Sequence, residues 1–326
     1  MAVITLVANT DYSALSVADG DTIALSTFTL NLDAIPAQIN VIVSTASTGK
    51  MTLLSATNYP LTGWTMTAGT GALIASVPVG TTLGGTLIGG SAGSAFGCTT
   101  NSGTITHCKG GAFNGAVGVG TNNGTITTAA GGTVNGGHGC TSNNGTITNA
   151  NGGFTSIVTV GCGTNNASGL IVNVTGGGTS FSPGCITNNG TITNCTGGSF
   201  SNAFGVTTNN GTITNCTGGS GVQGCNINNG TVITAIATAV NSISTNNGVV
   251  LNITNAAAIA VNTWNGSRAF CIGDGVRGTI PSNITTLYVQ GALHASAIVS
   301  GSTTVIVLSS GTARPFHPLS TPQVIG

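Results

Sequence analysis

The chain has 326 residues, of which 53 are glycine, and its five basic and five acidic side chains give a formal net charge of zero. So few charges beside 40% hydrophobic residues exclude a disordered polyampholyte, and the absence of a basic cluster argues against binding of nucleic acid or anionic lipid. No run approaches the ~18 consecutive apolar residues of a membrane span. We therefore expect a neutral, β-rich protein without a membrane-spanning segment.

The N-terminal region, residues 1–84, is predicted to be a β-rich cap or attachment region. Ile23 and Leu25, and then Leu30 and Leu32, alternate with polar residues, as in strands with one buried face. The first residues lack a basic segment, so they are predicted to form a strand rather than a signal peptide. The chain is accordingly expected to fold where it is made.

A repeated unit of about 21 residues occupies residues 85–266, and the stretches Asn188–Gly198 and Asn209–Gly219 are identical. The glycine of its Gly-Thr-Ile-Thr core recurs from Gly103 to Gly248 at intervals of 21, 21, 24, 21, 21, 19 and 18 residues. Self-similarity at such a period is typical of stacked coils. We predict an all-β protein, a right-handed parallel β-helix or β-solenoid, with β-rich modules at both ends.

The last region, residues 267–326, regains charge and proline and contains the apolar run Val305–Leu308. It is predicted to form a C-terminal β module that acts as a cap or an assembly region, because the open ends of a solenoid would otherwise pair with other chains.

The residue two positions after each core glycine is aliphatic, from Ile105 to Val250, and is predicted to point inward. Its neighbours then point outward, because side chains alternate across a strand. Leu170 and Val172 interrupt this pattern. The outward threonines form a candidate exposed ladder, an ice or ligand face: Thr104, Thr106, Thr125, Thr127, Thr146, Thr148, Thr191, Thr193, Thr212 and Thr214.

Asparagine pairs precede most of the core glycines, as at Asn122-Asn123, and Gly-Gly pairs follow them, as at Gly110. We interpret both as corner residues, because asparagine and glycine tolerate positive φ, and we expect asparagine side chains in register to hydrogen-bond along the stack. Five of the pairs spell Asn-Gly-Thr, a formal glycosylation acceptor, but a sugar on every coil would compete with a packed ladder.

The cysteines share positions of the repeat with valine and alanine, which indicates small buried hydrophobic residues rather than metal ligands. There is no Cys-x-x-Cys pair, so neither a metal nor a cofactor is expected. Cys195 and Cys216 lie on successive coils and form a possible disulfide, because coils stack ~4.8 Å apart. Free buried thiols are the favoured interpretation.

No enzymatic activity is expected. The positions from Ala34 to Gly273 contain no carboxylate, so the paired acids of a glycosidase are missing from the repeat. His107 beside Cys108 and His138 near Cys140 are the only local pairs of base and nucleophile, and adjacent strand residues face opposite ways.

Four phenylalanines suggest two interpretations. They could contact sugars, or they could stack and fill a corner of the core, which is the interpretation we favour. The residues are Phe96, Phe113, Phe200 and Phe204.

The Thr-Ile-Thr units between Gly103 and Thr214 resemble the Thr-x-Thr files of β-solenoid antifreeze proteins. That resemblance implies an ice-binding face that orders water, and an extracellular location.

The chain as a whole resembles bacteriophage virion proteins such as tail fibres, spikes and capsid-attached fibres. The resemblance rests on the opening Ala18–Leu25, the shaft rich in glycine, threonine and asparagine, and the distinct end. It implies a non-enzymatic structural protein for assembly and host-surface attachment, located in the virion after folding in the host cytoplasm. Its implied partners are itself, as a homotrimer, other virion proteins and host surface glycans. A bacterial surface or filament protein with the same architecture is a further alternative.

Overall fold

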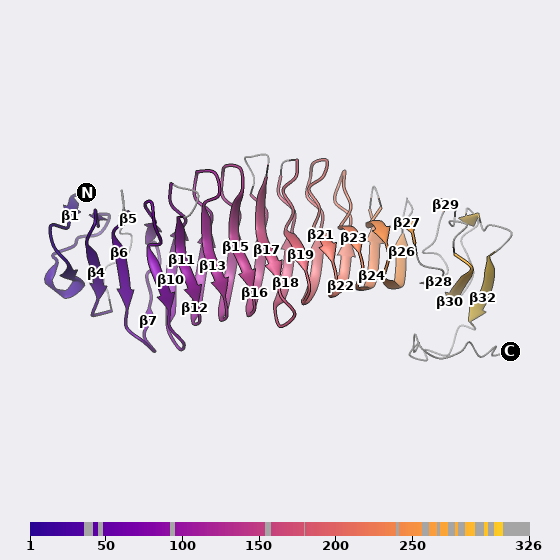
Figure 1. The fold of residues 1–326 in the computed structure, drawn as a ribbon, viewed down its shortest axis with the longest axis horizontal. Coiled ribbons are helices and arrows are strands. Elements are labelled where there is room, and N and C mark those ends of the chain that lie inside the picture. Colours follow the sequence, from indigo (N-terminus) through magenta and orange to yellow (C-terminus); the bar gives the residue numbers. More distant parts are fainter. Residues whose placement is uncertain are drawn as a thin grey trace.

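The computed structural model confirms the predicted fold: an all-β solenoid of about 11 turns, with parallel sheets and coils about 21 residues apart (Figure 1). No helix among the described residues is long and apolar enough to span a membrane. The structure describes residues 1–35, 42–44, 48–91, 95–153, 158–178, 180–238, 241–255, 261–265, 268–272, 278–279, 284–290, 297–298 and 303–308.

Two long parallel sheets run the length of the stack, and each coil gives one strand to each. Sheet A consists of β1 (Val3–Thr5), β3 (Thr22–Ala24), β5 (Ile42–Ser44), β8 (Thr65–Thr67), β10 (Thr82–Ile88), β12 (Thr104–Lys109), β14 (Thr125–Ala130), β16 (Thr146–Asn151), β18 (Leu170–Thr175), β20 (Thr191–Thr196), β22 (Thr212–Thr217), β24 (Thr231–Ala237) and β26 (Val249–Asn255), with β7 (Asn58–Tyr59) also pairing with β10. Sheet B consists of β2 (Thr10–Asp11), β4 (Thr29–Leu32), β6 (Lys50–Leu53), β9 (Ile74–Val77), β11 (Phe96–Asn101), β13 (Val117–Asn122), β15 (Gly137–Asn143), β17 (Thr159–Asn165), β19 (Cys185–Asn188), β21 (Val206–Asn209), β23 (Cys225–Asn228), β25 (Ile243–Asn246) and β27 (Val261–Trp264).

The N-terminal region belongs to the same stack as the repeats. Sheets A and B continue from β1 and β2 into the repeat region, and the boundary expected after residue 84 falls inside β10. A short 3-10 helix, η1 (Tyr12–Ala14), packs at this end, where the Tyr12 and Trp64 ring centroids are 6.0 Å apart. The different sequence of residues 1–84 therefore fills the first coils with larger side chains without ending either sheet.

The C-terminal region has sheets of its own. Strands β28 (Arg268–Ile272), β30 (Thr286–Gln290) and β32 (Thr304–Leu308) form a parallel sheet, and β29 (Gly278–Thr279) pairs with β31 (Ala297–Ile298). Arg268 pairs with Thr286, and Thr286 with Thr304, so this module also advances by one coil per strand. Its pairing resembles the shaft, although its sequence does not carry the repeat.

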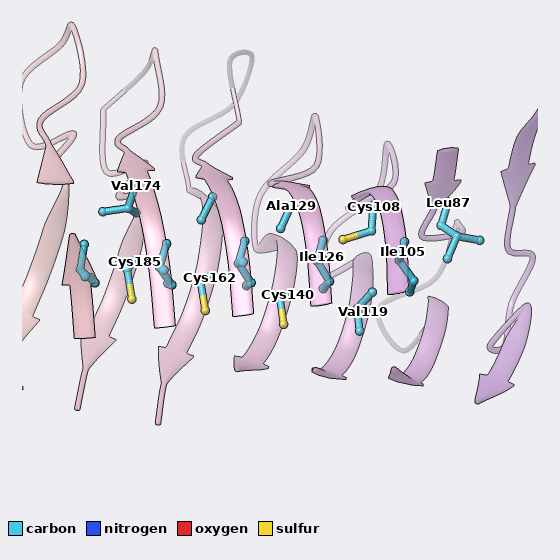
Figure 2. Close-up of a cluster of buried hydrophobic side chains, with 14 of the residues drawn as sticks. Leu87, Ile105, Cys108, Val119, Ile126, Ala129, Cys140, Cys162, Val174 and Cys185 are labelled. Atoms are coloured by element: carbon cyan, nitrogen blue, oxygen red, sulfur yellow. The ribbon is translucent and has the colours of Figure 1, made fainter. Parts of the chain in front are cut away.

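The core consists of files of identical or similar side chains between the two sheets (Figure 2). The isoleucine file of sheet A, from Ile105 through Ile126 to Ile213, is almost fully buried. Burying one such side chain in each coil contributes roughly 1.5–3 kcal/mol per residue. Because every coil repeats the same contacts, the core has no centre and extends along the whole shaft.

The corner asparagines and glycines do not have the positive φ that we expected, and that part of the interpretation is wrong. Among the described residues beyond β10, positive φ occurs instead in the loops that follow the Gly-Gly pairs, at Gly115, Gly136, Phe181 and Asn202. At Gly211 a side chain is excluded for another reason, since its Cβ would collide with the backbone oxygen of the core glycine one coil earlier. The core glycines are required by the close approach of stacked backbones.

The close approach of stacked backbones at the core glycines predicts the effects of two alanine substitutions. Gly211→Ala places a methyl group against the neighbouring backbone and is expected to destabilise the fold by about 1–3 kcal/mol or more. Gly221→Ala is the matched control, because a Cβ added at Gly221 would meet no other atom within 4 Å, and it is expected to change stability by less than about 0.5 kcal/mol. Denaturant unfolding measures both, and equal effects would contradict the close-approach explanation.

Candidate functional site: the threonine files of sheet A

The ten candidate threonines lie in two outward files on sheet A. The first file pairs Thr104 with Thr125 and Thr125 with Thr146, and after an interruption it pairs Thr191 with Thr212. The second file is Thr106, Thr127, Thr148, Thr193 and Thr214, two residues further along each strand. Thr125, Thr127 and Thr191 are exposed, and the other seven are half-buried.

The backbone sets the spacing of this surface. Neighbouring strands lie ~4.8 Å apart, and residues two apart on one strand are separated by ~6.6 Å. The strands pair in constant register over these coils, so the hydroxyl groups form a regular two-dimensional grid. Such a grid presents the same polar group at fixed intervals along the shaft.

Most of the threonine hydroxyls make no hydrogen bond to the part of the chain that the structure describes. Of the ten, Thr106 alone makes a side-chain hydrogen bond to another described residue, donating to the Leu83 carbonyl over 3.4 Å. The remaining hydroxyls are available to water, to a ligand or to another chain.

One coil divides the grid into two blocks. Leu170 stands in register between Thr146 and Thr191, and Val172 occupies the corresponding place in the second file. Both are half-buried, so the aliphatic break lies on the outward face rather than in the core. The grid is continuous only over three coils before the break and over those after it.

An asparagine file beside the second threonine file was not anticipated. Each Nδ2 donates to the Oδ1 of the preceding coil, from Asn173 to Asn149 (3.1 Å), from Asn194 to Asn173 (2.9 Å) and from Asn215 to Asn194 (3.0 Å). In these strands two consecutive residues, such as Thr193 and Asn194, are half-buried while the residue on each side is fully buried. The asparagine after Thr-Ile-Thr was the available sequence signal, but strict alternation would have placed it inside.

Sheet B carries a further polar file that was also missed. Its members are half-buried residues immediately before the buried asparagine of each coil, and they pair coil to coil. They are Thr100, Thr121, Ser142, Thr164, Thr187 and Thr208. Both broad faces of the shaft are therefore lined with hydroxyl groups.

The first asparagine of each pair is fully buried and stacks as expected. Asn122 donates from Nδ2 to Oδ1 of Asn143 over 2.7 Å, and the same bond joins Asn188 to Asn209. Each Nδ2 also lies within hydrogen-bond distance of a core glycine carbonyl, as from Asn122 to Gly124 (3.2 Å). The prediction of a side-chain asparagine ladder is confirmed, and it satisfies amides that would be costly to bury alone.

The eight cysteines from Cys98 to Cys225, whose side chains the structure describes, point into the core and are free thiols. Cys140, Cys162 and Cys185 pair in register on sheet B (Figure 2). The Sγ atoms of Cys195 and Cys216, the possible disulfide, are 3.9 Å apart and not bonded to each other. These side chains act as packing residues in the same files as valine and alanine.

Among the described residues, no hydrogen bond joins either histidine to the cysteine near it. His107 is exposed while Cys108 is buried, so their side chains face opposite sides of the strand. His138 is half-buried, its Nδ1 has no hydrogen-bond partner among the described residues, and burial lowers its pKa. The described residues contain no group of three or more His, Cys, Asp or Glu side chains that could hold a metal ion.

The favoured interpretation of the phenylalanines is wrong for two of them. Phe113 and Phe200 are 52% and 57% exposed, in the loops after Gly-Gly pairs, and do not fill the core. Phe96 and Phe204 are half-buried. These loops protrude from one edge of the shaft (Figure 1), which the sequence period could not reveal.

Comparison with protein-family models, with curated proteins and with solved structures finds no match to this chain.

The buried thiols predict how stability depends on pH. Burial raises the pKa of Cys98 from its ordinary value of 9.0 to about 12, and it raises the pKa of Cys108 and Cys225 well above 9.0. Above pH 9 the unfolded chain releases thiol protons that the folded chain keeps. Stability is therefore expected to be fully present below pH 9 and to fall as the pH rises toward 12, by up to about 1.4 kcal/mol per pH unit for each such thiol.

Denaturant unfolding between neutral and alkaline pH measures this slope. The control is the double variant Cys98→Val, Cys225→Val, because valine already occupies the same file at Val119 and Val206. The variant should fold and show a shallower alkaline loss. An unchanged slope would contradict the assignment of the effect to these thiols.

Proposed function

We propose that this chain is a non-enzymatic structural protein of a virus particle, a phage fibre, spike or decoration protein, whose solenoid serves assembly and host-surface attachment. The observation that carries the proposal is the continuity of sheets A and B from β1 and β2 to β26 and β27. Each coil is hydrogen-bonded to the next through both sheets. Bending or opening such a shaft requires several backbone hydrogen bonds to break together, so it can transmit force and hold its ends apart.

The composition of the shaft supports assembly with further protein chains. Between Lys50 and Arg268 the only charged side chain is Lys109. A surface of hydroxyls, amides and exposed phenyl groups has little electrostatic repulsion against an identical surface. The proposed partners are further copies of the chain, with a trimer favoured, together with other virion proteins.

The oligomeric state of the full-length chain tests this proposal. Light scattering after size exclusion, with and without reductant, is expected to show a stable trimer or a larger assembly. Reductant should not change the mass, because the described cysteines are buried and free. A monomer in both conditions would contradict the assembled fibre.

Ice binding is the second candidate function, and the grid of threonine hydroxyls on sheet A favours it. Nine of the ten hydroxyls make no side-chain hydrogen bond within the described part of the chain, and their spacing is regular. The break at Leu170 and Val172 limits the continuous area on which water could be ordered.

Substitution of the second threonine file tests the ice-binding candidate. The triple variant Thr127→Leu, Thr148→Leu, Thr193→Leu is expected to abolish thermal hysteresis if this face binds ice, and to leave the circular dichroism spectrum unchanged. The matched control replaces Thr121, Thr187 and Thr208 on sheet B with leucine and should keep the activity. Hysteresis that survives the first variant would exclude sheet A as an ice face.

A further inference from the structure

The second asparagine of each pair forms a ladder on the outside of the shaft, here called the outer ladder. In it Nδ2 donates to the Oδ1 of the preceding coil, opposite in direction to the inner ladder, as from Asn144 to Asn123 (2.9 Å) and from Asn210 to Asn189 (3.0 Å). Six of its residues are followed by glycine: Asn123, Asn144, Asn189, Asn210, Asn229 and Asn247.

Asparagine followed by glycine has a characteristic chemical weakness. The backbone nitrogen of the next residue can attack the side-chain carbonyl carbon, and glycine permits the necessary backbone conformations because it has no Cβ. Asparagine is accordingly among the thermolabile residues. Two nitrogens control the reaction, the side-chain Nδ2 that leaves and the glycine nitrogen that attacks, so hydrogen bonds to either of them oppose it.

In most members of the outer ladder, both Nδ2 of the asparagine and the backbone nitrogen of the following glycine donate a hydrogen bond. Asn210 donates from Nδ2 to Asn189, and the nitrogen of Gly211 donates to the Asn188 carbonyl over 2.9 Å. The same two bonds occur in three further coils, those of Asn144, Asn229 and Asn247. Attack in these coils requires both hydrogen bonds to break.

Asn189 is the exception. It is exposed, and among the described residues its Nδ2 donates to no acceptor and the nitrogen of Gly190 makes no hydrogen bond. At Asn123 the Nδ2 also lacks an acceptor in the described part of the chain, but the nitrogen of Gly124 donates to the Asn101 carbonyl over 3.1 Å.

Nδ2 of Asn189 lacks an acceptor because the coil that precedes Asn189 is irregular. Its corner is extended by Ala167 and Ser168 between Asn166 and Gly169, and Asn166 turns its Nδ2 toward Asn144 (2.7 Å) and Ser142 (2.8 Å). The bond to Asn144 is the ordinary ladder bond, but among the described residues none joins Nδ2 of Asn189 to Asn166, so the outer ladder stops at Asn166 and begins again at Asn189.

We propose that Asn189 is a site of spontaneous deamidation in the folded shaft. The nitrogen of Gly190 forms a bond to Cγ of Asn189, the Cγ–Nδ2 bond breaks, and Nδ2 leaves as ammonia with the proton from the Gly190 nitrogen. Water then opens the resulting succinimide. Opening at Cγ gives aspartate, and opening at the main-chain carbonyl gives isoaspartate.

The surrounding structure tolerates the aspartate product at this position and at few others. A carboxylate at residue 189 keeps an oxygen that accepts the hydrogen bond from Asn210. A carboxylate at residue 210 would instead place an acceptor against the Asn189 Oδ1, and two facing acceptors repel. In the part of the outer ladder that begins at Asn189, Asn189 is thus the residue whose side-chain Nδ2 can be lost without loss of a hydrogen bond.

The chain contains an internal control for the measurement. Asn188–Gly198 and Asn209–Gly219 have identical sequences, and a threonine precedes both, so Asn189 and Asn210 have the same local chemistry when unfolded. The native full-length chain is incubated at mildly alkaline pH, digested with pepsin and mapped by mass spectrometry for aspartate and isoaspartate. A parallel sample is kept unfolded in urea.

Native Asn189 is expected to deamidate at least about tenfold faster than native Asn210, because two hydrogen bonds, from Asn210 Nδ2 and from the Gly211 nitrogen, must break before Asn210 reacts. In urea the two rates should be equal. Equal native rates, a faster Asn210, or no reaction at native Asn189 while the unfolded sample reacts would each overturn the proposal.

Two variants give an independent measurement. Asn189→Asp is expected to leave the melting temperature unchanged at neutral pH, and Asn210→Asp to lower it. Equal decreases in melting temperature would overturn the assignment of Asn189 as the residue whose side-chain Nδ2 donates no hydrogen bond. If Asn210→Asp does not fold, the comparison of rates in the unmodified chain still decides.

Discussion

The hydrogen-bonded distance between neighbouring coils is the constraint on which the rest of this structure depends. Parallel pairing fixes that distance at ~4.8 Å and places each residue against its equivalent on the coils before and after it. The residue at each position of the repeat must therefore pack against the equivalent residues of the neighbouring coils. Gly124 and Gly211 are glycines because the backbone of the preceding coil leaves no room for a Cβ, and Cys195 stacks on Cys216 as easily as Val174 stacks on Cys195.

The same constraint explains how a nearly uncharged chain can bury polar groups. An asparagine amide has a donor and an acceptor at opposite sides, so a stack of identical amides satisfies itself without any counter-charge. Asn122 and Asn143 do this inside the shaft, and Asn210 and Asn229 do it outside, with the donors pointing the other way. Because each bond depends on the neighbouring coil, an irregular coil can disturb the outer files, whereas the inner ladder continues through it from Asn143 to Asn165 and Asn188. The coil with the 24-residue interval interrupts the threonine grid at Leu170 and the outer ladder before Asn189.

Much of the fold was predictable from the repeat. The period gave stacked coils, and alternation across Thr-Ile-Thr placed Ile126 inside and Thr125 and Thr127 outside, as the structure has them. Alternation of Cys140 with Val119 at one position indicated buried packing, and both side chains are fully buried. These inferences succeed because they use only the local geometry of a strand and the equivalence of successive coils.

What the sequence by itself determined is the solenoid, its inward files and the stacking of the inner asparagines. Tertiary structure alone decided that the first coils share both sheets with the shaft, although residues 1–84 lack the repeat. It also decided that Phe113 and Phe200 lie exposed and that Asn194 joins an outward file. The same holds for Nδ2 of Asn189 and the backbone nitrogen of Gly190, which donate no hydrogen bond to the described residues. The physical reason is that the neighbours that matter lie one coil away, about 21 residues along the chain. Local alternation fixes which side the Thr-Ile-Thr residues face, but the neighbouring coils fix which atoms each side chain meets.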